Sequence, residues 1–195
     1  MVKNNDYKKD HQLASSNAIA EKLESHYIRK MNKNGNKVVK CIEETSKEQQ
    51  YKGIDRRLFV RKGTKLDAIT IEEKIRRNFY NDILLEVVSN DTYPMGTVKN
   101  IGWIKKELEC NLIAFYFMQQ DRLFMFDWKI FQKTYELHGP EWIEKAINEE
   151  NGFKWVQARN SRTYPNRVYT YFSHSLIVPS KELIKRYMEV YKEKD

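Results

Sequence analysis

The stretch KGIDRRLFVRKGTKLDAITIEEKIRR, residues 52–77, decides the fold of this chain, because it predicts two antiparallel strands joined by a short turn. Gly63-Thr64 stands at its centre, and a two-residue turn there pairs residues that lie at equal distances from it. Asp55 then faces Glu72, with Cβ atoms about 5 Å apart. The hairpin is therefore predicted to bring two carboxylates together.

The residues after Glu72 divide between the two faces of the strand, because side chains alternate along it. Lys74 joins Asp55 and Glu72 on one face, and Glu73 points to the other. Two carboxylates so close repel each other, and one takes up a proton unless a cation lies between them. Mg²⁺ binds through one or two carboxylates together with waters and phosphates, and a neighbouring lysine can offset charge on phosphorus. This set of groups suits hydrolysis of a phosphodiester.

GID followed by ITIEEK resembles the PD-(D/E)XK nuclease superfamily, the restriction-endonuclease-like fold. The resemblance covers about residues 16–130 and rests on a short motif, an acid followed after a variable gap by ExK. Gly53-Ile54 stands where many members carry a proline, and many others lack it. The resemblance implies an α/β fold with a restriction-endonuclease-like core, in which α-helices flank a mixed central β-sheet.

The same resemblance implies roles for individual residues. Asp55, Glu72 and the backbone carbonyl of Glu73 would hold Mg²⁺ or Mn²⁺, and Lys74 would position water or stabilise the transition state. An acid on the first helix often helps to hold the metal in this superfamily. Glu21 is the best match for it, and Glu24 is the alternative, although a glutamate on the polar face of a helix is usually only solvated.

Apolar periodicity and turn residues predict alternating helices and strands, which is typical of an α/β domain. We expect a flexible basic arm over 1–15 and a single domain over 16–195. Within it we expect helices over 15–36, 102–120, 140–150 and 179–192, strands over 37–44, 82–90, 122–132, 153–160 and 167–178, a polar linker over 45–52 and a loop over 90–100.

Charge and composition limit the partners. The chain has 195 residues with a net charge of +8, which favours a polyanionic partner such as nucleic acid. It contains two cysteines, Cys41 and Cys110, with no CxxC pair, and no apolar run of membrane-spanning length. We therefore expect a cytoplasmic protein without a membrane partner. A homodimer is a further expectation, since nucleases that cut both strands often work as pairs.

Three other features have two interpretations each. Arg159, Arg162, Arg167 and Tyr164 interleave basic and aromatic residues, which suits nucleic-acid contact, and equally a solvated loop. Glu86 lies inside LLEVV, where a lone buried carboxylate would be costly. It either pairs with a basic residue such as Lys74, or lies near the metal as a further ligand, or faces solvent at the edge of the sheet. His174 is a general base or, as is commoner on an aromatic strand, a hydrogen-bonded structural residue without a pairing partner in the sequence.

The sequence thus favours a metal-dependent nuclease, expected to be an endonuclease. The resemblance points to DNA rather than RNA as its substrate. Two alternatives stay open, a non-catalytic nucleic-acid-binding protein and a protein-interaction protein on the same fold. In both alternatives the two acids and the lysine form only a solvated cross-strand salt bridge.

Overall fold

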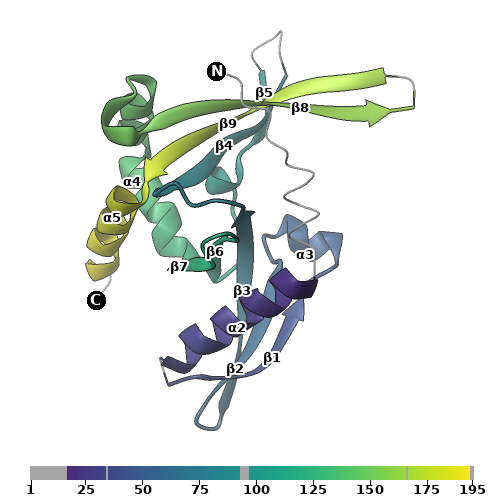
Figure 1. Ribbon diagram of the computed structural model, residues 1–195, viewed down its shortest axis with the longest axis vertical. Coiled ribbons are helices and arrows are strands. Elements are labelled where there is room, and N and C mark those ends of the chain that lie inside the picture. The colour runs from purple at the N-terminus through teal and green to yellow at the C-terminus, as the bar shows by residue number, and fades with distance from the viewer. Residues whose placement is uncertain (1–16, 34, 93–96, 166, 194–195) are drawn as a thin grey trace. The chain divides into compact units, whose positions relative to one another are not determined.

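The computed structural model describes residues 17–33, 35–92, 97–165 and 167–193 (Figure 1). The expected arm over 1–15 lies outside them. The single domain expected over 16–195 comprises two compact units. Of the described residues, the first unit holds 17–79 together with Glu107–Lys129, and the second holds Tyr80–Lys106 and the chain from Ile130 onward.

The first unit is built on a mixed five-stranded sheet, as expected for the α/β class. The strands follow the order β1-β2-β3-β6-β7, with β3 and β6 parallel and the other neighbours antiparallel. Its elements are α2 (Asn17–Lys33), β1 (Lys37–Glu43), α3 (Lys47–Tyr51), β2 (Arg56–Lys62), β3 (Lys65–Arg76), β6 (Leu112–Phe117) and β7 (Arg122–Asp127).

The hairpin of β2 and β3 has the register that the sequence predicts. Lys62 pairs with Lys65 across the two-residue turn, and Arg56 pairs with Ile71 at the open end. Gly63 takes a φ of 60°, which a glycine adopts without strain. The alternation of side chains along β3 follows from this register.

Helix α2 covers one face of this sheet. Leu23, Tyr27 and Met31 recur every four residues and are buried against apolar side chains of four strands (Figure 1). Leu58 and Val60 of β2, Ile71 of β3, Ala114 and Tyr116 of β6, and Leu123 of β7 complete this core. The face of β3 that carries Ile71 is therefore the helix face, and Glu72 belongs to the opposite face.

The second unit is built on an antiparallel sheet with the order β5-β4-β9-β8. Its elements are β4 (Asp82–Thr92), β5 (Thr97–Ile101), η1 (Trp103–Lys105), α4 (Trp128–Ile147, whose first two residues belong to the first unit), η2 (Glu150–Gly152), β8 (Lys154–Tyr164), β9 (Arg167–Pro179) and α5 (Ser180–Lys192). Leu183, Tyr187 and Val190 form the buried face of α5.

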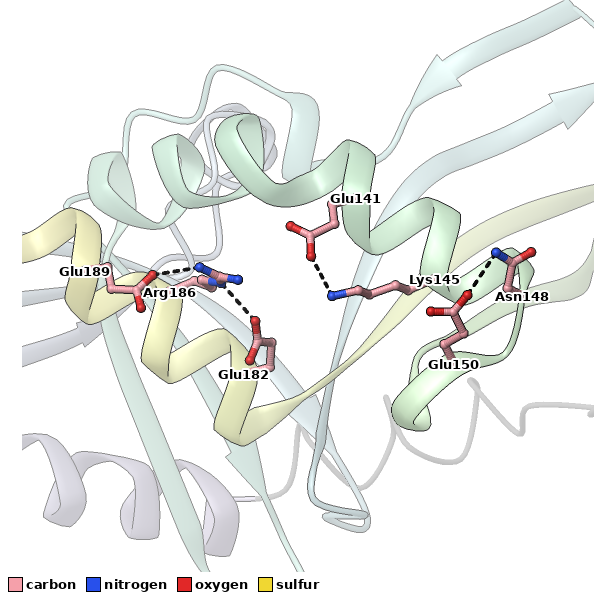
Figure 2. A network of polar contacts seen from close by, with 7 residues as sticks. All are labelled: Glu141, Lys145, Asn148, Glu150, Glu182, Arg186 and Glu189. Atoms are coloured by element: carbon pink, nitrogen blue, oxygen red, sulfur yellow. Dashed lines mark hydrogen bonds and ion pairs between the residues drawn. The ribbon is translucent and has the colours of Figure 1, made fainter.

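Neighbouring turns of α4 and α5 carry ion pairs at helical spacing, close enough for the charge of Arg186 to act on Glu141 (Figure 2). Glu141 accepts a hydrogen bond from Lys145 on α4, and Arg186 donates to Glu182 and Glu189 on α5. Such exposed pairs contribute little to stability. They form no paired-carboxylate site.

The helix expected over 102–120 is wrong. Trp103–Lys105 forms a 3-10 turn, a loop follows, and Leu112–Phe117 is the strand β6 between β3 and β7. Its residues are buried on both faces, so the apolar run shows no alternation and resembles a buried helix. Conversely, the strand expected over 122–132 ends at Asp127, where α4 begins.

Helix α4 also starts earlier than expected. Pro140 lies inside the helix rather than at its start. Trp128, Ile130, Phe131 and Tyr135 are buried along the preceding turns, and this packing outweighs the backbone hydrogen bond that proline removes. Two shorter expectations are corrected as well, because α3 lies within the expected linker and β5 within the expected loop.

Strand β4 carries the largely apolar run 83–88, which is typical of a strand buried on both faces or nearly so. Ile83, Leu85 and Val87 are buried, and the residues between them are half-buried, so only one face is fully covered. No helix in the described part of the chain is long and apolar enough to cross a membrane.

Candidate metal centre

The start of β2 is fixed by the turn that precedes it. Helix α3 ends at Tyr51, and Gly53, two residues later, has a φ of +74° and donates its N–H to the carbonyl of Gln50. A Cβ at Gly53 would lie 2.9 Å from the Cβ of Leu108, so both the backbone angle and the space favour glycine. The chain turns here, buries Ile54 and enters the sheet at Asp55.

Asp55 is held by the backbone on three sides. Its N–H donates to the carbonyl of Ile71 at 2.9 Å, and its carbonyl accepts the N–H of Glu44 at 2.8 Å. Its carboxylate Oδ2 accepts the N–H of Glu73 at 2.8 Å. The side chain therefore reaches across to β3 from the position directly before β2 begins.

Glu72 and Lys74 lie on the face opposite α2, as the register predicts. The Lys74 ammonium contacts the Glu72 carboxylate, and the two side chains are 25% and 10% exposed. Arg56 pairs with Ile71, so the next position outward sets Asp55 opposite Glu72, and the Asp55 carboxylate accepts the N–H of the adjoining Glu73. The structure therefore brings together the three residues that the sequence predicted for catalysis.

The electrostatics of Asp55 reflect this crowding. Burial raises the pKa of its carboxyl to about 6, and the negative charge of Glu72 adds to the rise. The Glu73 N–H and the Lys74 ammonium lower the pKa, and they offset only part of it. Near neutral pH the Asp55 carboxyl therefore keeps a proton more readily than an ordinary aspartate does.

Glu73 points to the helix face, and its carboxylate is fully engaged there. Arg56 Nε donates to Glu73 Oε1 at 2.6 Å, and Tyr27 of α2 donates its hydroxyl to the same oxygen at 2.8 Å. Burial, followed by the charge of Glu73, raises the pKa of the Tyr27 hydroxyl well above its usual value. The network connects helix α2 to the open end of the hairpin.

The sequence analysis did not identify Arg56 and Tyr27. A signal for Arg56 was present, because the pleat that turns Glu73 away from Glu72 also turns Arg56 away from Asp55 and onto the face of Glu73. Arg56 is only 4% exposed. The position of Tyr27 depends on the docking of α2, so the sequence carried no comparable signal for it.

The donor set fits a hard divalent cation in part. Asp55 and Glu72 supply two carboxylates, which is the number that Mg²⁺ commonly takes from a protein. In an extended strand the N–H and C=O of one residue point to the same side, so the Glu73 carbonyl faces Asp55 as its N–H does. Among the residues that the structure describes, however, no group of three or more His, Cys, Asp or Glu side chains could hold a metal.

The acids expected on the first helix do not join this pair. Glu21 is exposed on α2, and Glu24 lies near Cys41, whose pKa its charge raises. Helix α2 packs on the face opposite Glu72, so both glutamates lie on the other side of the sheet. Any further ligands would be water and substrate oxygens.

Glu86 and His174 lie in the second unit, away from a sheet edge. Glu86 stands on β4, an inner strand, and accepts a hydrogen bond from Ser89. His174 Nε2 lies 3.0 Å from Asp91 Oδ2, so it does have a pairing partner, one that the sequence analysis missed. Its ring centroid is 6.0 Å from that of Trp155. This arrangement agrees with the structural interpretation of His174.

The predicted nucleic-acid-binding residues lie in the hairpin of β8 and β9. Arg159 is exposed on β8. In the backbone register Arg162 is opposite Tyr169, and Tyr164 is opposite Arg167. The segment is thus mainly strand rather than the solvated loop of the alternative interpretation.

No protein-family model, curated protein or solved structure matches this chain.

Proposed function

We propose that this protein is a metal-dependent nuclease with a restriction-endonuclease-like core, acting on DNA in preference to RNA. The observation that carries the proposal is the hairpin register, which sets Asp55 opposite Glu72 while the Lys74 ammonium contacts the Glu72 carboxylate. Repulsion within this pair is relieved by a bound cation, and Mg²⁺ or Mn²⁺ suits carboxylate oxygens.

In this proposal Asp55, Glu72 and the Glu73 carbonyl hold the ion. A bound Mg²⁺ supplies a coordinated water of lowered pKa and stabilises negative charge on a phosphoryl oxygen. Lys74 donates a hydrogen bond to the attacking water or to the phosphoryl oxygen, where its positive charge offsets the charge that develops. Arg56 and Tyr27 hold Glu73 from the other face, which keeps the Glu72–Lys74 side of β3 toward Asp55.

The test is cleavage of supercoiled plasmid and single-stranded DNA with Mg²⁺ or Mn²⁺, with EDTA as the blank. Asp55→Ala and Lys74→Ala should each reduce the cleavage rate by about 100-fold or more, the usual effect of removing a group that stabilises the transition state. Asp67→Ala and Lys65→Ala are matched controls on the same hairpin, since both side chains are at least half exposed. Circular dichroism checks that all four variants fold. Full activity of Asp55→Ala or Lys74→Ala would refute the role of that residue.

A non-catalytic nucleic-acid-binding protein is the second candidate, and two observations favour it. Lys74 already neutralises part of the negative charge of the pair without a metal. The described residues also offer no third acidic, histidine or cysteine ligand. Salt-dependent binding of DNA with no product under any metal would establish this alternative in place of the nuclease.

A further inference from the structure

The hairpin of β8 and β9 extends beyond the sheet to which it belongs (Figure 1). Pairing between β4 and β9 runs from Pro179 only as far as Phe172. Pairing between β8 and β9 continues to Tyr164 opposite Arg167. Residues 160–171 therefore include a two-stranded ribbon that lacks pairing with β4, which we call the arm.

The arm and the strand residues leading to it carry only positive charge. From 151 to 180 the chain contains no aspartate or glutamate, and its basic residues are Lys154, Arg159, Arg162 and Arg167. This segment supplies four of the eight excess positive charges. Three of the four are arginines, whose planar guanidinium groups bind phosphate or the O6 and N7 atoms of guanine through two hydrogen bonds.

The described side chains of the arm present a surface without an apolar core of its own. Tyr169 and Tyr171 stack on each other, with ring centroids 6.1 Å apart. Val168, beside the turn, is 65% exposed. A two-stranded ribbon with few apolar contacts is marginal alone, so an interaction with a partner would stabilise it.

The dimensions of the arm select one nucleic-acid form. Five residues per strand give a length of about 16 Å, and a two-stranded ribbon with its side chains is about 10 Å thick. The major groove of B-form DNA is about 12 Å wide and admits such a ribbon, whereas the minor groove, about 6 Å wide, does not. The major groove of duplex RNA is too deep and narrow for side chains to read.

We propose that the arm enters the major groove of double-stranded DNA, with Arg159, Arg162 and Arg167 contacting phosphates and base edges. This inference deepens the proposed function by naming the substrate form, and it rests on that function only for the choice of DNA. It concerns binding, so it is tested in EDTA, where no cleavage takes place.

The experiment measures the affinity of the full chain for a 25-base-pair DNA duplex by fluorescence anisotropy across a salt series. The variant Arg159→Ala/Arg162→Ala/Arg167→Ala should bind at least 10-fold more weakly. The slope of log K against log salt should flatten by about 0.9 for each arginine that contacts a phosphate, and by about 2.7 if all three do. The control Lys181→Ala/Lys185→Ala/Lys192→Ala removes the same charge from exposed positions of α5 and should change both quantities far less.

Competition identifies the groove and the form of nucleic acid. Methyl green, which occupies the major groove, should displace the wild-type chain, and netropsin, which occupies the minor groove, should not. An RNA duplex and a single strand of the same sequence should bind more weakly and lose little affinity in the arm variant. Three results would each overturn the inference. The first is displacement by netropsin alone, and the second is an equal loss of affinity for all three nucleic acids in the triple arginine variant. The third is a triple arginine variant that binds the DNA duplex as tightly as the wild type does. If one of these outcomes overturns the inference, Asp55-dependent cleavage by the wild type would show that the proposed function still stands.

Discussion

Replacing Asp55 by asparagine should stabilise the metal-free protein at neutral pH. The pKa of Asp55 rises from the usual 3.8 to about 6, because of burial and the nearby charge of Glu72. At pH 8 both the folded and the unfolded chain have lost this proton, and the folded chain holds the charge unfavourably. A shift of about two pKa units corresponds to about 3 kcal/mol of lost stability.

The sign of the pH dependence follows from the direction of the shift. Between pH 3.8 and about 6 the folded chain binds a proton on Asp55 that the unfolded chain has released, so stability falls as the pH rises through this window. Asparagine carries no charge at any pH, and its side-chain oxygen still accepts the Glu73 N–H. The advantage of Asp55→Asn should thus be about 3 kcal/mol at pH 8, about half of that at pH 5, and close to zero at pH 4.

The assay is urea unfolding in EDTA at several pH values, together with thermal melting, where 3 kcal/mol corresponds to about 6 to 12 °C for a chain of this size. Asp67→Asn, an exposed aspartate of the same hairpin, is the control and should show no such pH dependence. Adding Mg²⁺ or Mn²⁺ should raise the melting temperature of the wild type and leave that of Asp55→Asn unchanged. A variant no more stable than the wild type at pH 8, or a difference that does not change with pH, would refute the crowding of the two carboxylates.

Two further substitutions test the packing around the candidate centre and within the second unit. Arg56→Met leaves the Glu73 carboxylate, whose side chain is 10% exposed, without its cation, and should lower the free energy of unfolding in urea by about 3 to 5 kcal/mol. The double variant Arg56→Met/Glu73→Gln should recover part of this loss. A loss below about 1 kcal/mol in Arg56→Met would contradict the buried pair. Gly102→Ala would place a Cβ 2.0 Å from the Glu86 carbonyl oxygen of β4, so thermal melting should show a loss of about 3 kcal/mol or more. Gly63→Ala is the control, since that position is open and only its positive φ, which costs about 1 kcal/mol, disfavours alanine. An equal loss of stability in the two variants would show that the close approach at Gly102 is absent.

The elements that the sequence located correctly are those specified by short-range patterns. The turn at Gly63-Thr64 and the alternation on either side of it specify the β2–β3 register without reference to the rest of the chain. Helix α2 follows from the four-residue spacing of Ile19, Leu23 and Tyr27, and the last helix, α5, was also located. The proximity of Asp55 and Glu72 is a consequence of that register, so it too was predictable.

Other parts of the structure depend on partners distant in the sequence. Strand β6 pairs with β3, and Leu112 lies beside Ile71, 41 positions earlier. The intervening segment includes β4, β5 and η1 of the second unit. An apolar run buried on both faces has no period that distinguishes strand from helix, and only the neighbouring strands supply the hydrogen bonds that decide it.

The sequence by itself determined the hairpin, its register and the faces of its charged residues, because a tight turn and the two-residue pleat act over a few residues. The tertiary structure alone decided that β6 is a strand, that Tyr27 of α2 holds Glu73, and that Glu21 lies on the other side of the sheet from Glu72. These features need surfaces from distant segments, whose pairing is settled by burial and hydrogen bonding that no local pattern encodes.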